Sequence, residues 1–188
     1  MIAALRIVSS MLAALACTYA AGVYGQSYPA KPVRLIIPFA PGGGSDLMGR
    51  LLAQRLGDRF GQQFVVDNRP GAGGSIGTEA AVKAPPDGYT LVLGSTSEIS
   101  INPSLYTRLS YNTLRDLAPV AIVAYTPLVL VVHPSMPTRS VKEVIALAKA
   151  RPGDINFASA GNGSTLQLAA EMFRSEAGIN IVHVPYKG

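Results

Sequence analysis

The sequence contains one cysteine, two histidines and no tryptophan among its 188 residues. With Cys17 alone, neither a disulfide bond within the chain nor a metal site built from cysteines can form. Paired histidine motifs and acid pairs at a catalytic spacing are also missing. Gly42-Gly43-Gly44 is not followed by the Gly-Lys-Ser/Thr of a P-loop. These absences argue against metal-dependent and nucleotide-hydrolysing enzymes, and we expect neither a cofactor nor a metal ion.

Charged residues are also sparse. They make up 14% of the chain, against 48% hydrophobic residues, and the net charge is +5. The basic residues are scattered, without a basic run or interleaved aromatic residues, so we expect no nucleic-acid partner. The composition is typical of a globular protein with an additional apolar segment. The length allows one medium-sized domain or two small ones.

The additional apolar segment lies at the N-terminus. Residues 1–25 carry one charge, on Arg6, followed by an uncharged stretch that ends in small residues. This pattern predicts a secretory signal peptide, which we expect to be cleaved near Gly25–Gln26. An alternative is lipid attachment at Cys17, although the preceding leucine is poorly placed for that modification. In both cases the mature protein is expected outside the cytoplasmic membrane, in the periplasm.

The stretch from Pro38 to Asp46 is rich in glycine. The apolar run Val33 to Ile37 predicts a buried parallel strand before it, and Leu47 to Leu56 predicts a helix after it, with Ser45 as the N-cap. Such a turn directs several free backbone N–H groups at one place, where the helix dipole adds about half a positive charge. We therefore predict an anion site made of main-chain groups, which holds a carboxylate.

Strands and helices alternate along the rest of the chain. Further strand-like runs lie at residues 64–67, 89–94, 117–125, 128–132, 155–158 and 181–184. Helices are expected after Gly77, after Ser140 and after Thr165, and the helix after the first turn is expected to bury Leu47 and Leu51. This alternation predicts parallel βαβ units and an α/β fold.

Three other stretches invite a functional interpretation. Residues 159–165, Ser-Ala-Gly-Asn-Gly-Ser-Thr, form a second turn between a strand and a helix, and we expect ligand contact there. For Gly71–Gly77, close packing of helix on sheet is favoured over ligand contact. Ser95 and Thr96 follow a strand at the sheet edge where ligands collect, and for them contact and a structural role are both open. His133 and His183 lie in Val-rich runs and are expected to have local partners.

The two anion-binding turns lie in different predicted domains. Residues 26–125 are expected to form the first α/β domain, and residues 126–188 the second. If the domains face one another, a molecule with two carboxylates can be held at each end by backbone N–H groups. Closure of the domains would then exclude water. Such a protein binds its ligand without making or breaking a bond.

Several motifs occur in an order that resembles the tripartite tricarboxylate transporter substrate-binding proteins, the Bug family of extracytoplasmic solute receptors. The resemblance covers the chain from about Tyr28 to Gly188. Its motifs are residues 28–46, Asp67-Asn68-Arg69-Pro70-Gly71-Ala72-Gly73-Gly74, Pro86-Asp87-Gly88-Tyr89-Thr90-Leu91 and Val184-Pro185-Tyr186-Lys187-Gly188.

The resemblance implies a type II periplasmic-binding-protein fold, with two parallel-sheet α/β domains and a ligand cleft. It also implies a monomeric receptor that delivers a small carboxylate to a two-subunit integral membrane permease. The carboxylate class includes di- and tricarboxylates, amino dicarboxylates and aromatic acids. Together with the turns above, it gives these candidate ligand-binding residues: Phe39, Ala40, Gly42, Gly43, Gly44, Ser45, Asp46, Ser95, Thr96, Ser159, Ala160, Gly161, Asn162, Gly163, Ser164 and Thr165.

Two departures from the family pattern stand out. Relatives often carry histidine where this chain has Gln167, which leaves the identity of the ligand open. Relatives also extend well beyond the final motif, so we expect a C-terminally truncated chain with an incomplete second domain. Two alternatives remain open. One is a ligand-dependent periplasmic sensor without a transport role, and the other is an α/β enzyme that acts on a phosphorylated small molecule.

Overall fold

The structure is a computed structural model that describes residues 27–186. The expected signal peptide, its cleavage point and Cys17 lie outside these residues. Contacts within the chain separate the residues up to Ala30 from one compact unit that begins at Lys31. All elements described below belong to this second unit. Across residues 27–186, every helix falls short of the length and apolar content that crossing a membrane requires.

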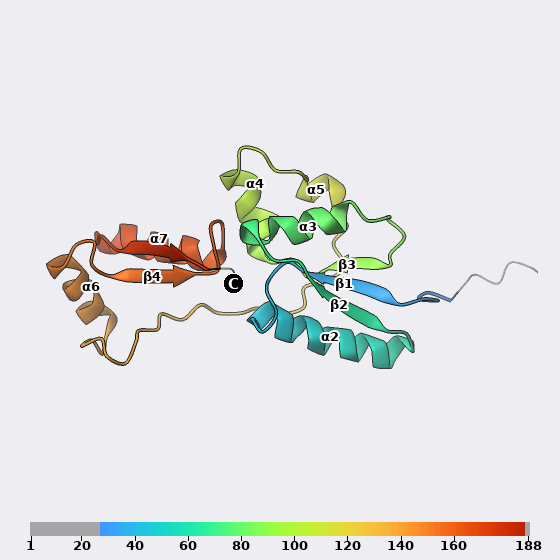
Figure 1. Cartoon of the computed structure of the whole chain (residues 1–188), viewed down its shortest axis with the longest axis horizontal. Coiled ribbons are helices and arrows are strands. Elements are labelled where there is room, and N and C mark those ends of the chain that lie inside the picture. Colours follow the sequence, from blue (N-terminus) through green and yellow to red (C-terminus); the bar gives the residue numbers. More distant parts are fainter. Residues whose placement is uncertain (1–26, 187–188) are drawn as a thin grey trace, which may run out of the picture. The chain divides into compact units, whose positions relative to one another are not determined.

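The first sheet has three parallel strands in the order β2-β1-β3 (Figure 1). They are β1 (Val33–Ile37), β2 (Phe64–Asn68) and β3 (Thr90–Val92). The central strand β1 is buried on both faces, as its short apolar run predicts, with Leu35 on one face and Ile36 on the other almost fully inaccessible to solvent. The predicted strands at these three places are confirmed.

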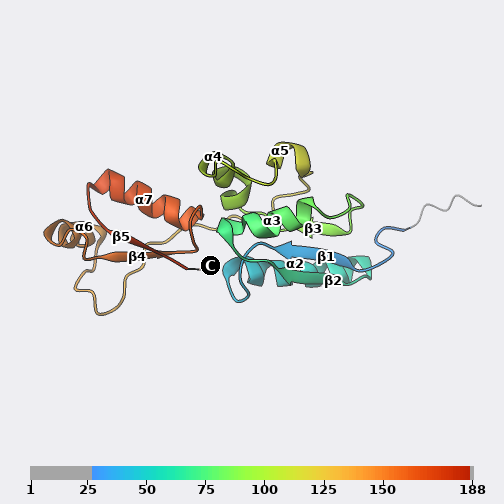
Figure 2. The ribbon, with the colours of Figure 1, turned by 45° about the horizontal axis from the view of Figure 1, so that its top comes forward.

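Helices cover both faces of this sheet. α2 (Gly44–Phe60) follows β1 and packs on one face, while α3 (Ser75–Val82) follows β2 and packs on the other (Figures 1 and 2). The strand order explains this placement, because right-handed connections from β1 to β2 and from β2 to β3 run in opposite directions across the sheet. Leu35, Ile37 and Ala53 form the buried centre of the core.

The start of α2 differs from the prediction. Its N-cap is Gly43 rather than Ser45, and no side chain caps that end. Asp46 in the first turn instead reaches back to the preceding turn, which lets the helix begin before Ser45. Leu47 and Leu51 are 70% and 48% exposed, so their predicted burial is wrong. The helix lies so close to the sheet that its buried positions hold small residues and Asp46.

Gly77 lies where α3 packs closely on the residues that follow β1 and β2. A Cβ atom at this position would lie 2.7 Å from Pro38 Cα and 2.9 Å from Arg69 O, both backbone atoms that cannot move aside cheaply. The close helix–sheet packing predicted for the Gly71–Gly77 turn is therefore confirmed at Gly77.

One short helix precedes α3, and three more follow β3. They are η1 (Ala72–Gly74), the π-helix η2 (Ser97–Ile101), α4 (Asn102–Leu105) and α5 (Thr113–Asp116). Asn102 is fully buried, and its Nδ2 donates to Gly73 O at 2.9 Å and to Ser75 Oγ at 2.8 Å. The turn before α3 is thus fixed by a side chain from α4.

The second sheet has two parallel strands. Its elements are α6 (Val141–Ala150), β4 (Asn156–Ser159), α7 (Thr165–Ala177) and β5 (Val182–Pro185). Ser140 and Ser164 cap α6 and α7 by accepting backbone N–H groups of the first turn, so the predicted cap at Ser140 is confirmed. Ala148, Ile179 and Ile181 form the buried centre of this second core.

Two predicted strands are wrong. Residues 117–125 and 128–132 belong to no sheet, and in the described part of the chain no backbone hydrogen bond involves residues 117–132. Most of their apolar side chains are exposed, for example Val120 at 86% and Val131 at 80%. The β-forming residues are present, but a strand also needs a neighbour that takes its N–H and C=O groups. No described strand lies beside these two runs.

We expect the variant G77A to lower the free energy of unfolding by about 1–3 kcal/mol, because its methyl group must displace backbone atoms. The matched control is G57A in α2, where an added Cβ meets only Gln62 O at 3.4 Å. G57A should raise the free energy of unfolding by up to about 1 kcal/mol, as alanine favours helices. Urea denaturation of both variants measures the difference, and equal stability of the two would contradict the close packing.

The unpaired run should be visible by amide hydrogen exchange. We expect residues 117–132 to exchange at close to the rate of an unfolded peptide, since their N–H groups have no acceptor in the described structure. β1 lies between β2 and β3 and is hydrogen-bonded to both, so its amides serve as the internal reference for slow exchange. Protection of 117–132 comparable to that of β1 would show that these residues have found a partner strand.

Candidate functional site

The first glycine-rich turn is organised around the carboxylate of Asp46. Asp46 Oδ2 accepts the Gly42 N–H at 2.9 Å and Arg50 Nε–H at 3.0 Å. Its other oxygen accepts from Asn68 Nδ2 at 3.0 Å, and the same Asn68 group donates to Phe39 O. Residues from the turn, from α2 and from the end of β2 therefore meet at one carboxylate. The sequence interpretation missed Arg50 and Asn68, which lie outside the turn.

Asp46 is strongly held in its ionised form. Its side chain is almost completely buried, yet its pKa is lowered from 3.8 to about 2. The hydrogen bond from Arg50 contributes most, followed by the bonds from the Gly42 N–H and Asn68. The turn thus contains a permanent carboxylate with a permanent guanidinium beside it. Asp46 is a helix-start residue that shapes the turn, as the sequence interpretation favoured.

The free hydrogen-bond donors of the first turn follow Gly42 in the chain and lie at the start of α2. Among the described residues, nothing accepts the N–H groups of Gly44, Ser45 or Asp46. They belong to the first turn of α2, where the helix dipole adds positive potential. The unbonded donors of this turn are therefore the first amides of α2, whereas the Gly42 N–H is already bonded.

The second turn is built in the same way but has fewer free donors. The Gly163 N–H donates to Gln167 Oε1 at 2.8 Å, just as the Gly42 N–H donates to the side chain four residues later. The Gly161 N–H donates to Ser159 Oγ at 3.1 Å. The Ser164 N–H donates to Gly161 O. A ligand can use the Gly163 amide only after Gln167 releases it.

The second turn also contacts residues of the first half of the chain. The Thr165 N–H donates to Ser97 Oγ at 3.0 Å. Tyr106 Oη donates to Asn162 O at 3.2 Å. A Cβ atom on Gly163, whose φ is +82°, would lie 2.4 Å from Asn102 Oδ1. Any side chain at Gly163 would therefore disturb this contact as well as the turn.

Ser95 is fixed by a buried carboxylate. The N–H of Ser95 donates to Glu98 Oε1 and its hydroxyl to Glu98 Oε2, at 2.5 and 2.7 Å. Burial raises the pKa of Glu98, which is fully inaccessible to solvent. Ser95 thus has a structural role, while Thr96 is exposed. Ser97, which sequence reasoning passed over, makes the contact with α7. Phe39, Ala40 and Ala160 are partly buried within their turns.

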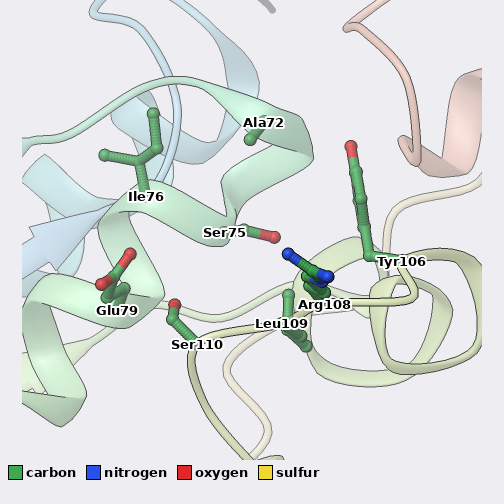
Figure 3. A pocket seen from close by; sticks show the side chains of 8 residues that line it. All are labelled: Ala72, Ser75, Ile76, Glu79, Tyr106, Arg108, Leu109 and Ser110. Carbon is green, nitrogen blue, oxygen red and sulfur yellow. The ribbon is translucent and has the colours of Figure 1, made fainter.

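A cavity of about 270 Å³ lies beside the Gly71–Gly77 turn (Figure 3). It is lined by Ala72, Ser75, Ile76, Glu79, Tyr106, Arg108, Leu109 and Ser110. The side chains of Ser75 and Arg108 point toward one another across it (Figure 3). None of the predicted ligand-binding residues lines this cavity.

Residues Gly73 to Gly77 match the Gly-x-Ser-x-Gly pattern of a hydrolase nucleophile elbow. Ser75 does not have the character of a nucleophile, because it is 9% exposed and its backbone has ordinary helical angles. Its Oγ is engaged by Asn102 and Tyr111, and no hydrogen bond joins it to a histidine. Residues 27–186 likewise contain no cluster of side chains suited to a metal ion.

The sequence profile described as "Tripartite tricarboxylate transporter family receptor" matches residues 48–188. The chain belongs to this family. It is a family of receptors rather than of enzymes. BugT of Bordetella pertussis is 46% identical over 170 residues, which cover 90% of this chain and 52% of BugT.

Solved structures of family relatives share the fold. A protein of R. palustris determined with adipate is 38% identical, with a TM-score of 0.84 over 86% of this chain and 54% of its own. MatC from Rhodopseudomonas palustris with bound malate is 27% identical, with a TM-score of 0.80 over 86% and 55%. The predicted α/β fold of periplasmic binding proteins is confirmed. The chain spans about half the length of the relatives that it matches.

The lowered pKa of Asp46 makes stability depend on pH in a defined direction. Because its folded pKa is about 2 against an ordinary 3.8, its stabilising contribution is present above about pH 4 and disappears as the pH falls through 2. We expect D46N to lower the melting temperature at neutral pH, and the difference from the parent to shrink as the pH falls below about 4. Thermal unfolding followed by circular dichroism measures this.

The control for this prediction is D58N, on the exposed face of the same helix, where no ion pair is found among the described residues. It should not lower the melting temperature at neutral pH. If the difference in melting temperature between D46N and the parent stayed constant down to about pH 2, this would contradict the assigned role of the carboxylate.

Proposed function

We propose that this protein is an extracytoplasmic receptor that captures a small dicarboxylate through the first turn of α2 and the turn at Ser159–Thr165. The observation that carries the proposal is the set of N–H groups of Gly44, Ser45 and Asp46 at the N-terminus of α2, for which residues 27–186 provide no acceptor. Hydrogen bonds from such groups to a carboxylate are among the stronger ones in proteins. No catalytic step is involved.

The position of these donors in the fold supports the proposal. They lie at the carboxyl end of the central strand β1. From there the chain connects to β2 on one side of β1, while β3 lies on the other side. Ligands of open α/β sheets bind at such a switch point, because the loops there diverge to opposite faces and leave a crevice. Relatives of similar fold were determined with adipate and with malate, which are both dicarboxylates.

The remainder of the proposal concerns the whole receptor. Residues 26–125 form its first lobe and residues 126–188 part of the second, and the ligand lies between them. A signal peptide at residues 1–25 directs the chain to the periplasm, where the loaded receptor docks on a two-subunit membrane permease of the tripartite tricarboxylate type. The family assignment supports this role.

The decisive experiment removes one backbone donor without touching a side chain. In G44P the ring replaces the N–H at the first helical position, where proline is well tolerated. Gly43 before it has φ −79° and ψ 171°, an extended conformation that suits a residue preceding proline. We expect G44P to weaken the binding of adipate or malate at least tenfold, since a hydrogen bond to a charged acceptor contributes about 1.5–3 kcal/mol.

The matched control is G44A, which retains the N–H and places its methyl group in open space. It should bind like the parent, and both variants should melt at the parent temperature. Isothermal titration calorimetry with adipate, malate and a monocarboxylate measures the affinities. Equal affinity of G44P and G44A for every acid that binds the parent would refute the proposed donor.

A further inference from the structure

A chain of hydrogen bonds joins the two glycine amides of the second turn through a histidine. The Gly163 N–H donates to Gln167 Oε1 at 2.8 Å, and Gln167 Nε2 lies 3.4 Å from His183 Nδ1. His183 Nε2 lies 2.6 Å from Ser159 Oγ, which accepts the Gly161 N–H at 3.1 Å. A change in the protonation of His183 therefore reaches the Gly163 amide through Gln167 and the Gly161 amide through Ser159.

The direction of each bond follows from the backbone donors. Because the Gly163 N–H can only donate, the oxygen of the Gln167 carboxamide faces it, and the NH2 group faces His183. Nδ1 of His183 must then accept, so the proton of the neutral ring is on Nε2 and is donated to Ser159 Oγ. The Ser159 hydroxyl in turn donates to Gly161 O at 3.3 Å. Every donor in this arrangement meets an acceptor only while His183 is neutral.

Protonation of His183 breaks this pattern at one place. A proton taken from solvent onto Nδ1 turns that atom into a donor that faces the NH2 group of Gln167, so two donors oppose each other. Rotation of the carboxamide by half a turn restores the bond, with Oε1 accepting from Nδ1. The NH2 group then faces the Gly163 N–H, and this buried amide has lost its acceptor. An unpaired buried N–H is costly, and an incoming carboxylate removes that cost.

We propose that His183 is a positioning residue that couples proton uptake to carboxylate capture at the second turn, with Gln167 as the rotating element. When His183 is neutral, the carbonyl of Gln167 occupies the Gly163 amide in place of a ligand. When His183 is protonated, the Gly163 N–H and the Gln167 NH2 group form a pair of donors for a carboxylate. The inference rests on the proposed function for the nature of the ligand. The proton coupling within the turn is independent of it.

None of the described charged side chains on the neighbouring elements is bonded to His183, so the proton on its own ring is the charge that controls the turn. Its ring stacks on Phe157 of β4 at 4.9 Å between centroids, and β4 has no titratable side chain. The charged or titratable side chains on the neighbouring elements are Glu171, Arg174 and Glu176 on α7, Lys142, Glu143 and Lys149 on α6, and Tyr186 just after β5. Glu171 is paired with Arg174 at 2.7 Å, and none of these groups is bonded to His183.

The first test needs no ligand. In the ¹⁵N-labelled chain, the backbone amide of Gly163 and the side-chain NH2 of Gln167 should shift together as the His183 ring takes up a proton. H183N places a carboxamide that does not titrate at the same position, and both shifts should vanish. In Q167A the Gly163 amide should no longer follow His183. The matched control is H133N, the other histidine, whose ring nitrogen Nδ1 is bonded to Ser135, and it should leave the response of the Gly163 amide as in the parent.

The second test uses calorimetry with malate as the probe. Binding at about pH 7 in buffers of different ionisation enthalpy should show net proton uptake by the parent and by H133N. The affinity should rise about tenfold from pH 8 to pH 6, as expected for one gained hydrogen bond to a charged group. The affinity of H183N for malate should change less than twofold over the same pH range. This variant also controls for the titration of malate itself.

The outcomes are distinguishable. A Gly163 amide that does not respond to pH, or that responds equally in H183N, overturns the inference whatever binds. Malate binding without proton uptake overturns it as well. A Gly163 amide that follows His183 while no dicarboxylate binds at any pH supports the coupling and counts against the proposed function.

Discussion

The structure depends on one constraint: a backbone N–H that a tight turn removes from water must have an acceptor. Glycine-rich turns at the ends of β1 and β4 bring several such groups together. In both turns a side chain from the following helix, four residues after the glycine, supplies the missing acceptor. Asp46 does so in the first turn and Gln167 in the second. The amides that remain free are those with which a ligand can bind.

The difference between the two acceptors gives the turns different properties. Asp46 carries a fixed charge and is held by Arg50 and Asn68, so it cannot leave its amide without leaving an unpaired guanidinium. Gln167 is neutral, and its carboxamide can face the glycine with either end. The first turn is therefore a rigid frame that presents the first amides of α2. The second is adjustable, and its state depends on the ring of His183 beneath it.

The parts of the fold that follow from short-range chemistry could be predicted. The apolar runs at β1 and β2, the glycine-rich turns and the serine cap of α6 all specify local structure. The runs at residues 117–132 carry the same strand-forming signal, and their prediction was wrong because the local pattern does not reveal whether another strand lies alongside. The burial of Leu47 and Leu51 was wrong for a related reason, since the closeness of α2 to its sheet is set by tertiary packing.

In the candidate site, the sequence indicated which turns collect N–H groups but not which of those groups are already bonded. That depends on where the side chains of Asp46 and Gln167 point, and on partners such as Asn68 that lie elsewhere in the chain. His183 was expected to have a local partner, and it has two, Ser159 and Gln167. Its link to the Gly163 amide becomes apparent only from the geometry of three side chains.

The unpaired segment has a consequence for handling the protein. Leu128 to Val132 is an uncharged run of Leu and Val, free of proline and glycine, which is the composition from which amyloid-like stacks of identical chains are built. Proline stands at both ends of the run, at Pro127 and Pro134, and proline interrupts the growth of such stacks. These two prolines therefore stand where gatekeeper residues flank an aggregation-prone run.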